Sequence, residues 1–99
     1  MDTTEIKKIL IKRGYQEKLA EVVAKELMTI DNRLVKPLSI WLEKGEESEV
    51  VIDDVSLKKL MFEKKMKYPA ALLTMDWMYK EPEVAIPIVL QKEFVLNKK

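Results

Sequence analysis

The chain has no cysteine and no histidine among its 99 residues. Without cysteine there is neither a disulfide nor a thiolate nucleophile, and a reducing cytoplasm is the expected compartment. Without histidine the chain lacks the commonest general base near neutral pH and the commonest transition-metal ligand. Structural zinc sites, Ser-His-Asp triads and Cys-His pairs are therefore excluded, which leaves carboxylate, lysine, tyrosine or bound magnesium for catalysis. We expect a protein that is not an enzyme and that uses no cofactor.

Glycine and proline are scarce, with two and four residues, which argues against long loops and flexible linkers. The longest uncharged apolar run is far shorter than the ~20 residues of a membrane span. The sequence also begins without the charged and then apolar segment of a secretory signal. With 47% hydrophobic residues, 35% charged residues and a net charge of +1, the composition is typical of a cytoplasmic globular protein. The length predicts a single domain over residues 1–99.

One segment, residues 68–79, is apolar on nearly every side of a helix. A helix with this property has to be covered by other elements. Pro69 suits the first helical position, where its missing N–H does no harm. We therefore predict an all-α fold, a compact domain of five to six helices whose central helix covers about residues 69–80.

Other segments have apolar residues at helical spacing, with capping residues before them and, in two cases, a glycine after them. The predicted helices cover residues 4–13, residues 16–30, a segment that ends at Gly45, residues 57–65, and a segment that begins at Pro82. Pro37 and Pro87 fall within two of these segments, and each is expected either to kink or to terminate its helix.

The spacing also predicts which side chains face the core. In the first helix these are Ile6, Ile9 and Leu10. For the second helix the predicted inner face consists of Leu19, Ala20, Val22, Val23, Ala24 and Leu27. For the last helix it consists of Val84, Ala85, Ile88 and Val89.

Residues 46–55 lack a helical period, and their β-branched centre predicts a short extended segment near residues 49–53. This segment is either isolated or one half of a small hairpin, for which residues 94–96 offer a partner of similar composition. Residues 31–55 contain seven acidic and three basic side chains. They lack the turn glycine and the alternating oxygen ligands of a calcium loop. We expect these carboxylates to favour solubility and attraction to the basic segment that follows, and we expect no metal site.

A DNA-binding helix-turn-helix is the alternative function, because residues 56–79 have the length of that motif. Residues 56–80 contain six lysines and two acidic residues. The lysines that would contact phosphates are Lys58, Lys59, Lys64, Lys65 and Lys67. However, a recognition helix needs polar and basic side chains that reach base edges. The recognition helix of this motif would be the central helix, which offers only Thr74 and Asp76 before its end. Two packed helices with solvated lysines explain the same pattern.

Methionine and aromatic side chains are frequent in residues 61–79. Methionine adapts its shape to varied apolar partners, although residues at this spacing also suit a plain core. Any uncovered side of the central helix would be an interface. The leading hypothesis is therefore a small adaptor that binds another protein or a second copy of itself as a homodimer. Its predicted partner-binding residues are Trp77, Met78, Tyr79, Met61 and Phe62.

The segment from Tyr68 to Trp77, followed by Glu81-Pro82-Glu83 and preceded by Arg13-Gly14-Tyr15, resembles a family of small helical proteins of Gram-positive bacteria and their phages. The resemblance implies an accessory protein of a phage or mobile element and implies no activity. Residues 5–30 alone also resemble the start of a ubiquitin-associated domain, from which they depart at Arg13, where those domains have methionine.

Overall fold

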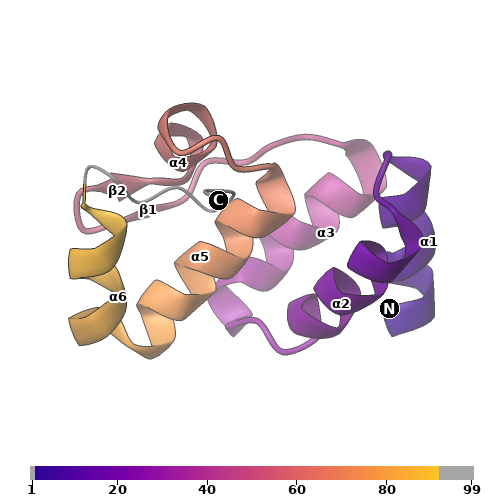
Figure 1. Ribbon diagram of the computed structural model, residues 1–99, viewed down its shortest axis with the longest axis horizontal. Coiled ribbons are helices and arrows are strands. Elements are labelled where there is room, and N and C mark those ends of the chain that lie inside the picture. The colour runs from indigo at the N-terminus through magenta and orange to yellow at the C-terminus, as the bar shows by residue number, and fades with distance from the viewer. Residues whose placement is uncertain (1, 92–99) are drawn as a thin grey trace.

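The computed structural model describes residues 2–91, and the all-α prediction is confirmed. Figure 1 shows the helices arranged about α5, which crosses the middle of the molecule. The elements are α1 (Thr3–Lys12), α2 (Glu17–Leu27), the 3₁₀ helix η1 (Asn32–Leu34), α3 (Val35–Lys44), β1 (Val51–Ile52), β2 (Val55–Ser56), α4 (Leu57–Glu63), α5 (Tyr68–Lys80) and α6 (Pro82–Val89).

The helix α5 is central, as its composition predicts. Helices α2, α4 and α6 all pack against it. The Tyr68 ring at its start stacks on the Trp41 ring of α3, with 5.9 Å between ring centroids. Its buried residues point in every direction around the helix: Tyr68, Pro69, Ala71, Leu72, Thr74, Met75, Asp76 and Met78. The apolar circumference is thus explained by burial on several sides.

The α1–α2 hairpin lies at one end of the molecule (Figure 1). Asp2 and Glu5 form a capping box at the start of α1, and Ile6 and Leu10 are buried as predicted. In α2 the buried residues are Ala20, Ala24 and Leu27.

The predicted inner face of α2 is too wide. Leu19 and Val22 are both exposed. Two residues advance a helix by about 200°, so Val22 lies on the opposite side from Ala20. Only the stripe of α2 that faces the neighbouring helices is covered, and the six residues of the predicted inner face extend beyond it.

Neither proline terminates its helix. Pro37 is the third residue of α3, in the first turn, where backbone N–H groups have no partner within the helix. Pro87 lies inside α6, which is assigned as one helix through it. Ala85 and Val89 are buried there, whereas Val84 is exposed, which corrects its predicted place on the inner face.

The predicted extended segment is one half of a local antiparallel hairpin. Val51 pairs with Ser56 and Ile52 pairs with Val55. Asp53 in the turn has φ 53°, a left-handed conformation that aspartate tolerates better than most residues. The alternative partner, residues 94–96, lies outside the described residues.

The helix α4 is two residues shorter than the predicted helix over residues 57–65. It ends at Glu63 because Lys65 adopts a left-handed conformation, with φ 61°. Such a residue cannot continue a right-handed helix.

Candidate interaction surface

The outer face of α4 exposes an aromatic side chain between lysines. Leu57 and Leu60 anchor the helix in the core. The Phe62 side chain has 82% of its surface exposed, and Lys58 and Lys59, one turn earlier, are exposed with it. Met61 is partly buried and packs against the core. We call Lys58, Lys59, Met61 and Phe62 the α4 surface.

The start of α4 is held by hydrogen bonds to Ser56, at the end of β2, and to Glu49, just before β1. The Ser56 side chain accepts a hydrogen bond from the Lys59 backbone N–H (3.3 Å). The Glu49 carboxylate accepts hydrogen bonds from the Ser56 hydroxyl (2.5 Å) and from the Lys58 backbone N–H (3.0 Å). Burial by itself would raise the pKa of Glu49, but these hydrogen bonds hold it below its usual value. The α4 surface therefore stands on a helix whose N-terminal N–H groups are already satisfied.

The other three predicted partner-binding residues lie elsewhere. Trp77, Met78 and Tyr79 belong to the last turns of α5, whereas Figure 1 shows α4 beside the beginning of that helix. Met78 is buried in the core, so its side chain is not available on the surface. The predicted set is thus divided into Met61 and Phe62 on α4 and three residues at the far end of α5.

Trp77 and Tyr79 have partners within the chain. The indole N–H of Trp77 donates a hydrogen bond to Glu81 Oε1 (2.9 Å). The Arg33 guanidinium lies over the Tyr79 ring, 3.7 Å from its centroid. Both side chains are partly buried. They are less suited than Phe62 to serve as anchors for a partner.

The five lysines of the DNA-binding alternative do not form one uniform surface. Lys58, Lys59, Lys65 and Lys67 are exposed, and Lys64 is partly buried. Lys64 donates a hydrogen bond to the Gln91 carbonyl oxygen (2.8 Å), and the Lys67 ammonium lies 4.9 Å from the centroid of the Tyr15 ring.

The helix α5 exposes few polar groups. It is covered on several sides, and its only basic residue is Lys80, at its last position. Lys80 forms an ion pair with Asp76 (2.9 Å) and donates a hydrogen bond to the Thr29 carbonyl oxygen (2.7 Å). A recognition helix presents polar or basic side chains to base edges. In α5, Thr74 and Asp76 are buried and Lys80 is engaged in these contacts.

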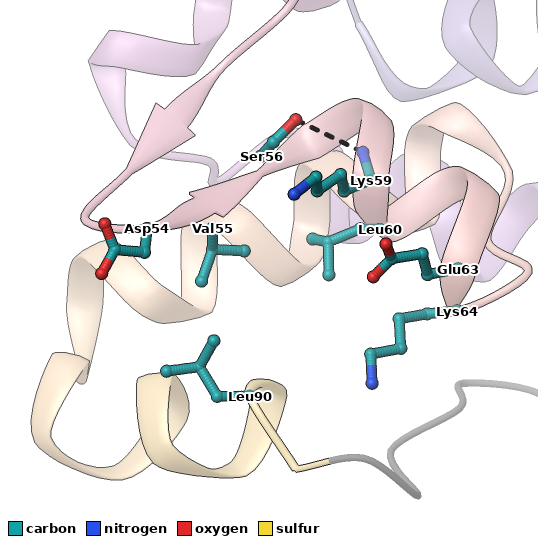
Figure 2. Close-up of a pocket in the computed structure, with 8 residues that line it drawn as sticks. All are labelled: Asp54, Val55, Ser56, Lys59, Leu60, Glu63, Lys64 and Leu90. Carbon is teal, nitrogen blue, oxygen red and sulfur yellow. Dashed lines mark hydrogen bonds between the residues drawn. The ribbon is translucent and has the colours of Figure 1, made fainter.

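A small groove lies beside α4, between the hairpin and the end of α6. Figure 2 shows Val55 and Leu60 pointing toward Leu90 across it. Both signs of charge line its rim, with Asp54 and Glu63 opposing Lys59 and Lys64. Its volume of about 110 Å³ is well below the ~300 Å³ at which small-molecule pockets begin. It offers room for a side chain of a partner and not for a cofactor.

A second groove, of about 280 Å³, separates α1 and α2 from α3. Its lining carries no charge, with Asn32 and Ser39 as the only polar residues. Met28 and Val35, both exposed, form part of its lining. This groove adds apolar surface on the side of the molecule that α1 to α3 form, but it holds no group that would orient a ligand by charge.

No constellation for metal binding is present in residues 2–91, where no three carboxylates converge as they would around an ion. Within the same residues every buried side-chain nitrogen or oxygen has a hydrogen-bond partner. None of the described helices has the length and hydrophobicity that crossing a membrane requires.

No family model matches the chain, and no curated protein or solved structure matches it at a significant level. The case for a function therefore depends on the surface of the molecule itself.

Proposed function

We propose that this chain is a non-enzymatic interaction protein that binds a protein partner through the α4 surface. The observation that carries the proposal is the 82% exposure of Phe62 on a helix whose other apolar residues pack inward. Transferring a phenylalanine side chain from water into a protein interface contributes about 1.5–3 kcal/mol. Aromatic anchors of this kind dominate binding energy at the centres of interfaces.

The rigid setting of α4 favours the same function. Hydrogen bonds from Ser56 and Lys58 to Glu49 fix the beginning of the helix before any partner arrives. A preorganised surface loses less conformational entropy on binding than a loop does. The small groove beside α4, on the side of the helix that carries Lys59 and Glu63, would admit one side chain of the partner.

We place this interaction in the cytoplasm, because the chain has no cysteine. The resemblance of the Tyr68–Trp77 segment to helical proteins of Gram-positive bacteria and their phages suggests an accessory role in such a cell. The burial of α5 counts against the DNA-binding alternative, which needs that helix in the major groove.

The test is a pull-down from a Gram-positive lysate with three tagged proteins: the original chain, Phe62→Ser and Val84→Ser. Val84 is a matched control, because it is another exposed apolar residue and lies on α6, outside the α4 surface. Both exposed positions should tolerate the change within about 0.5 kcal/mol, which circular dichroism melts would verify.

We expect one protein, either a different chain or an untagged copy of this chain added to the lysate, to be retained by the original chain and by Val84→Ser, with or without nuclease, and to be lost with Phe62→Ser. Equal retention by all three proteins would refute the role of the α4 surface. Retention that disappears after nuclease treatment and falls steeply with salt would instead indicate nucleic-acid binding, because each neutralised phosphate releases counterions.

A further inference from the structure

We infer that the partner of the α4 surface is a second copy of this chain, whose hairpin turn faces the α4 surface of the first. The inference rests on the proposed function, because it names the partner of that same surface. It starts from two patches of opposite charge that follow one another directly in the chain.

The first patch is the α4 surface, with Lys58 and Lys59 beside Phe62. The second, which we call the hairpin patch, consists of Val51 in β1 and of Asp53 and Asp54 in the turn. All three of its residues are exposed, and Val51 has 59% of its surface accessible. Each patch therefore combines one exposed apolar side chain with two like charges, and the charges of the two patches are opposite.

The charges of these patches form no ion pairs in the described part of the chain, although the Lys58 charge acts on the nearby Glu49 carboxylate. The ion pairs found in residues 2–91 involve neither Lys58 nor Lys59, and neither Asp53 nor Asp54. Figure 2 shows Asp54 and Lys59 at separate places along the groove. Both pairs therefore remain available to an oppositely charged surface.

The apolar residue of the hairpin patch faces away from the core. Val51 pairs with Ser56, and Ile52 pairs with Val55. Paired residues of an antiparallel ladder lie on the same face, and successive residues alternate between faces. Val55 is buried, so its face packs inward and Val51 lies on the outer face. The hairpin patch is thus an outer surface with an apolar contact point for Phe62.

The order of the two patches suits a two-fold dimer. The strand β2 ends at Ser56 and α4 begins at Leu57, so the patches are neighbours on each copy. A two-fold rotation that places one α4 surface on the partner's hairpin patch necessarily makes the reciprocal contact as well. Placing hairpin on hairpin would bring like charges together, and placing α4 on α4 would leave the aspartates of both hairpin patches without a cationic partner. The charges therefore select the crossed arrangement, and the apolar side chains supply most of the affinity.

The experiment measures molar mass across a concentration series by light scattering after size exclusion. One variant carries Lys58→Glu and Lys59→Glu, which makes both patches acidic. A second carries Asp53→Asn and Asp54→Lys, which makes both patches basic, and asparagine is chosen because it tolerates the left-handed conformation of residue 53. The control carries Lys18→Glu and Lys36→Glu, two exposed lysines on α2 and α3 that give the same change in net charge as the first variant.

We expect the original chain and the control to form dimers of about twice 11.6 kDa. Each patch variant alone should bind itself about tenfold or more weakly, because like charges then oppose each other at both contacts. An equimolar mixture of the two variants should regain the dimer mass, since every acidic patch then meets a basic one. Phe62→Ser should also be monomeric at concentrations where the original chain is a dimer.

A monomeric original chain at every concentration would overturn the inference. So would a mixture of the two variants that stays monomeric while the original chain dimerises. The proposed function is tested separately by the pull-down. A monomeric chain that still retains another protein in a Phe62-dependent way would keep that function and lose only the self-association.

Discussion

The carboxylate of Asp76 in α5 accepts a 2.8 Å hydrogen bond from the backbone N–H of Asp31, which lies 45 positions earlier in the sequence. Asp76 is buried, and its second oxygen pairs with the Lys80 ammonium at 2.9 Å. Lys80 in turn donates a hydrogen bond to the Thr29 carbonyl oxygen. The end of α5 is therefore tied through polar groups to the loop that joins α2 to η1.

Replacing Asp76 with alanine should destabilise the protein by about 1–3 kcal/mol, because a backbone N–H and an ammonium group lose their acceptor. Asp76→Asn should cost less, since its remaining side-chain oxygen still accepts the hydrogen bond from Asp31. Urea unfolding of both variants measures the difference. If asparagine costs as much as alanine, the charge of Asp76 matters more than the hydrogen bond.

Arg13 joins the end of α1 to the end of α3. Its Nη2 donates hydrogen bonds to the carbonyl oxygens of Trp41 (3.0 Å) and Leu42 (3.1 Å). Its guanidinium carbon also lies 4.8 Å from the centroid of the Trp41 ring. These carbonyls belong to the last turn of α3, where carbonyl groups lack the full set of partners found inside a helix. The Trp41 carbonyl also accepts a hydrogen bond from the Gly45 backbone N–H (2.8 Å). A cation there also interacts favourably with the helix dipole.

We predict that Arg13→Lys lowers stability by about 1 kcal/mol, because an ammonium group lacks the planar fork that reaches two carbonyls and stacks on the ring. Arg13→Ala should cost at least as much. Lys12→Ala, at the exposed neighbouring position, serves as the control and should change little. A lysine variant that unfolds at the same urea concentration as the original chain would show that charge alone is sufficient at this position.

Acid should destabilise the protein partly through Asp31. Hydrogen bonds from the side chain and the backbone of Arg33 lower the pKa of Asp31 to about 2 in the folded state. Because the folded pKa lies below the usual value of 3.8, the stabilisation is fully present above about pH 4 and is lost as the pH falls toward 2. Arg33→Met should therefore make the melting temperature depend less on pH between 4 and 2.

Thermal melts at pH 7, 4, 3 and 2 of the original chain and of Arg33→Met test this expectation. Glu49, whose pKa is also held low, contributes in the same direction in both proteins and cancels in the comparison. Parallel pH dependences of the two proteins would contradict the role assigned to the Asp31–Arg33 pair.

The sequence patterns were most informative where one periodicity decides the structure. The apolar circumference of residues 68–79 predicted the central helix, and the β-branched Val50–Ile52 segment predicted the short strand. They were less informative about which faces are covered. Leu19 and Val22 have the same chemistry as buried residues, and their exposure depends on where the neighbouring helices lie.

The candidate site shows the same limit. Phe62 belonged to the predicted partner-binding set, but so did Met78, which is buried. A helix that is apolar all round carries no sequence signal for the side that will be exposed. The role of Arg13 was not predictable either, because its carbonyl partners come 28 and 29 residues later in the chain. Contacts at that separation follow from the packing of whole helices.

The end of α4 supplies a final prediction. Lys65 lies two residues after the end of α4 and has a left-handed backbone conformation, with φ 61°. A residue other than glycine is strained in this conformation. Lys65→Gly should therefore raise the free energy of unfolding by roughly 0.5–1 kcal/mol, after allowance for the greater freedom of glycine in the unfolded chain. For a domain of this size that corresponds to an increase in melting temperature of about 2–8 °C.

The matched variants for Lys65 are alanine at the same position and glycine at Lys59. Lys65→Ala keeps a Cβ atom and should give no gain, so it separates relief of backbone strain from loss of the lysine charge. Lys59→Gly lies inside α4 and should destabilise by about 0.5–1 kcal/mol, since glycine is unfavourable in the interior of a helix. If Lys65→Gly and Lys65→Ala melt at the same temperature, residue 65 is not strained in solution and α4 does not end for the reason given above.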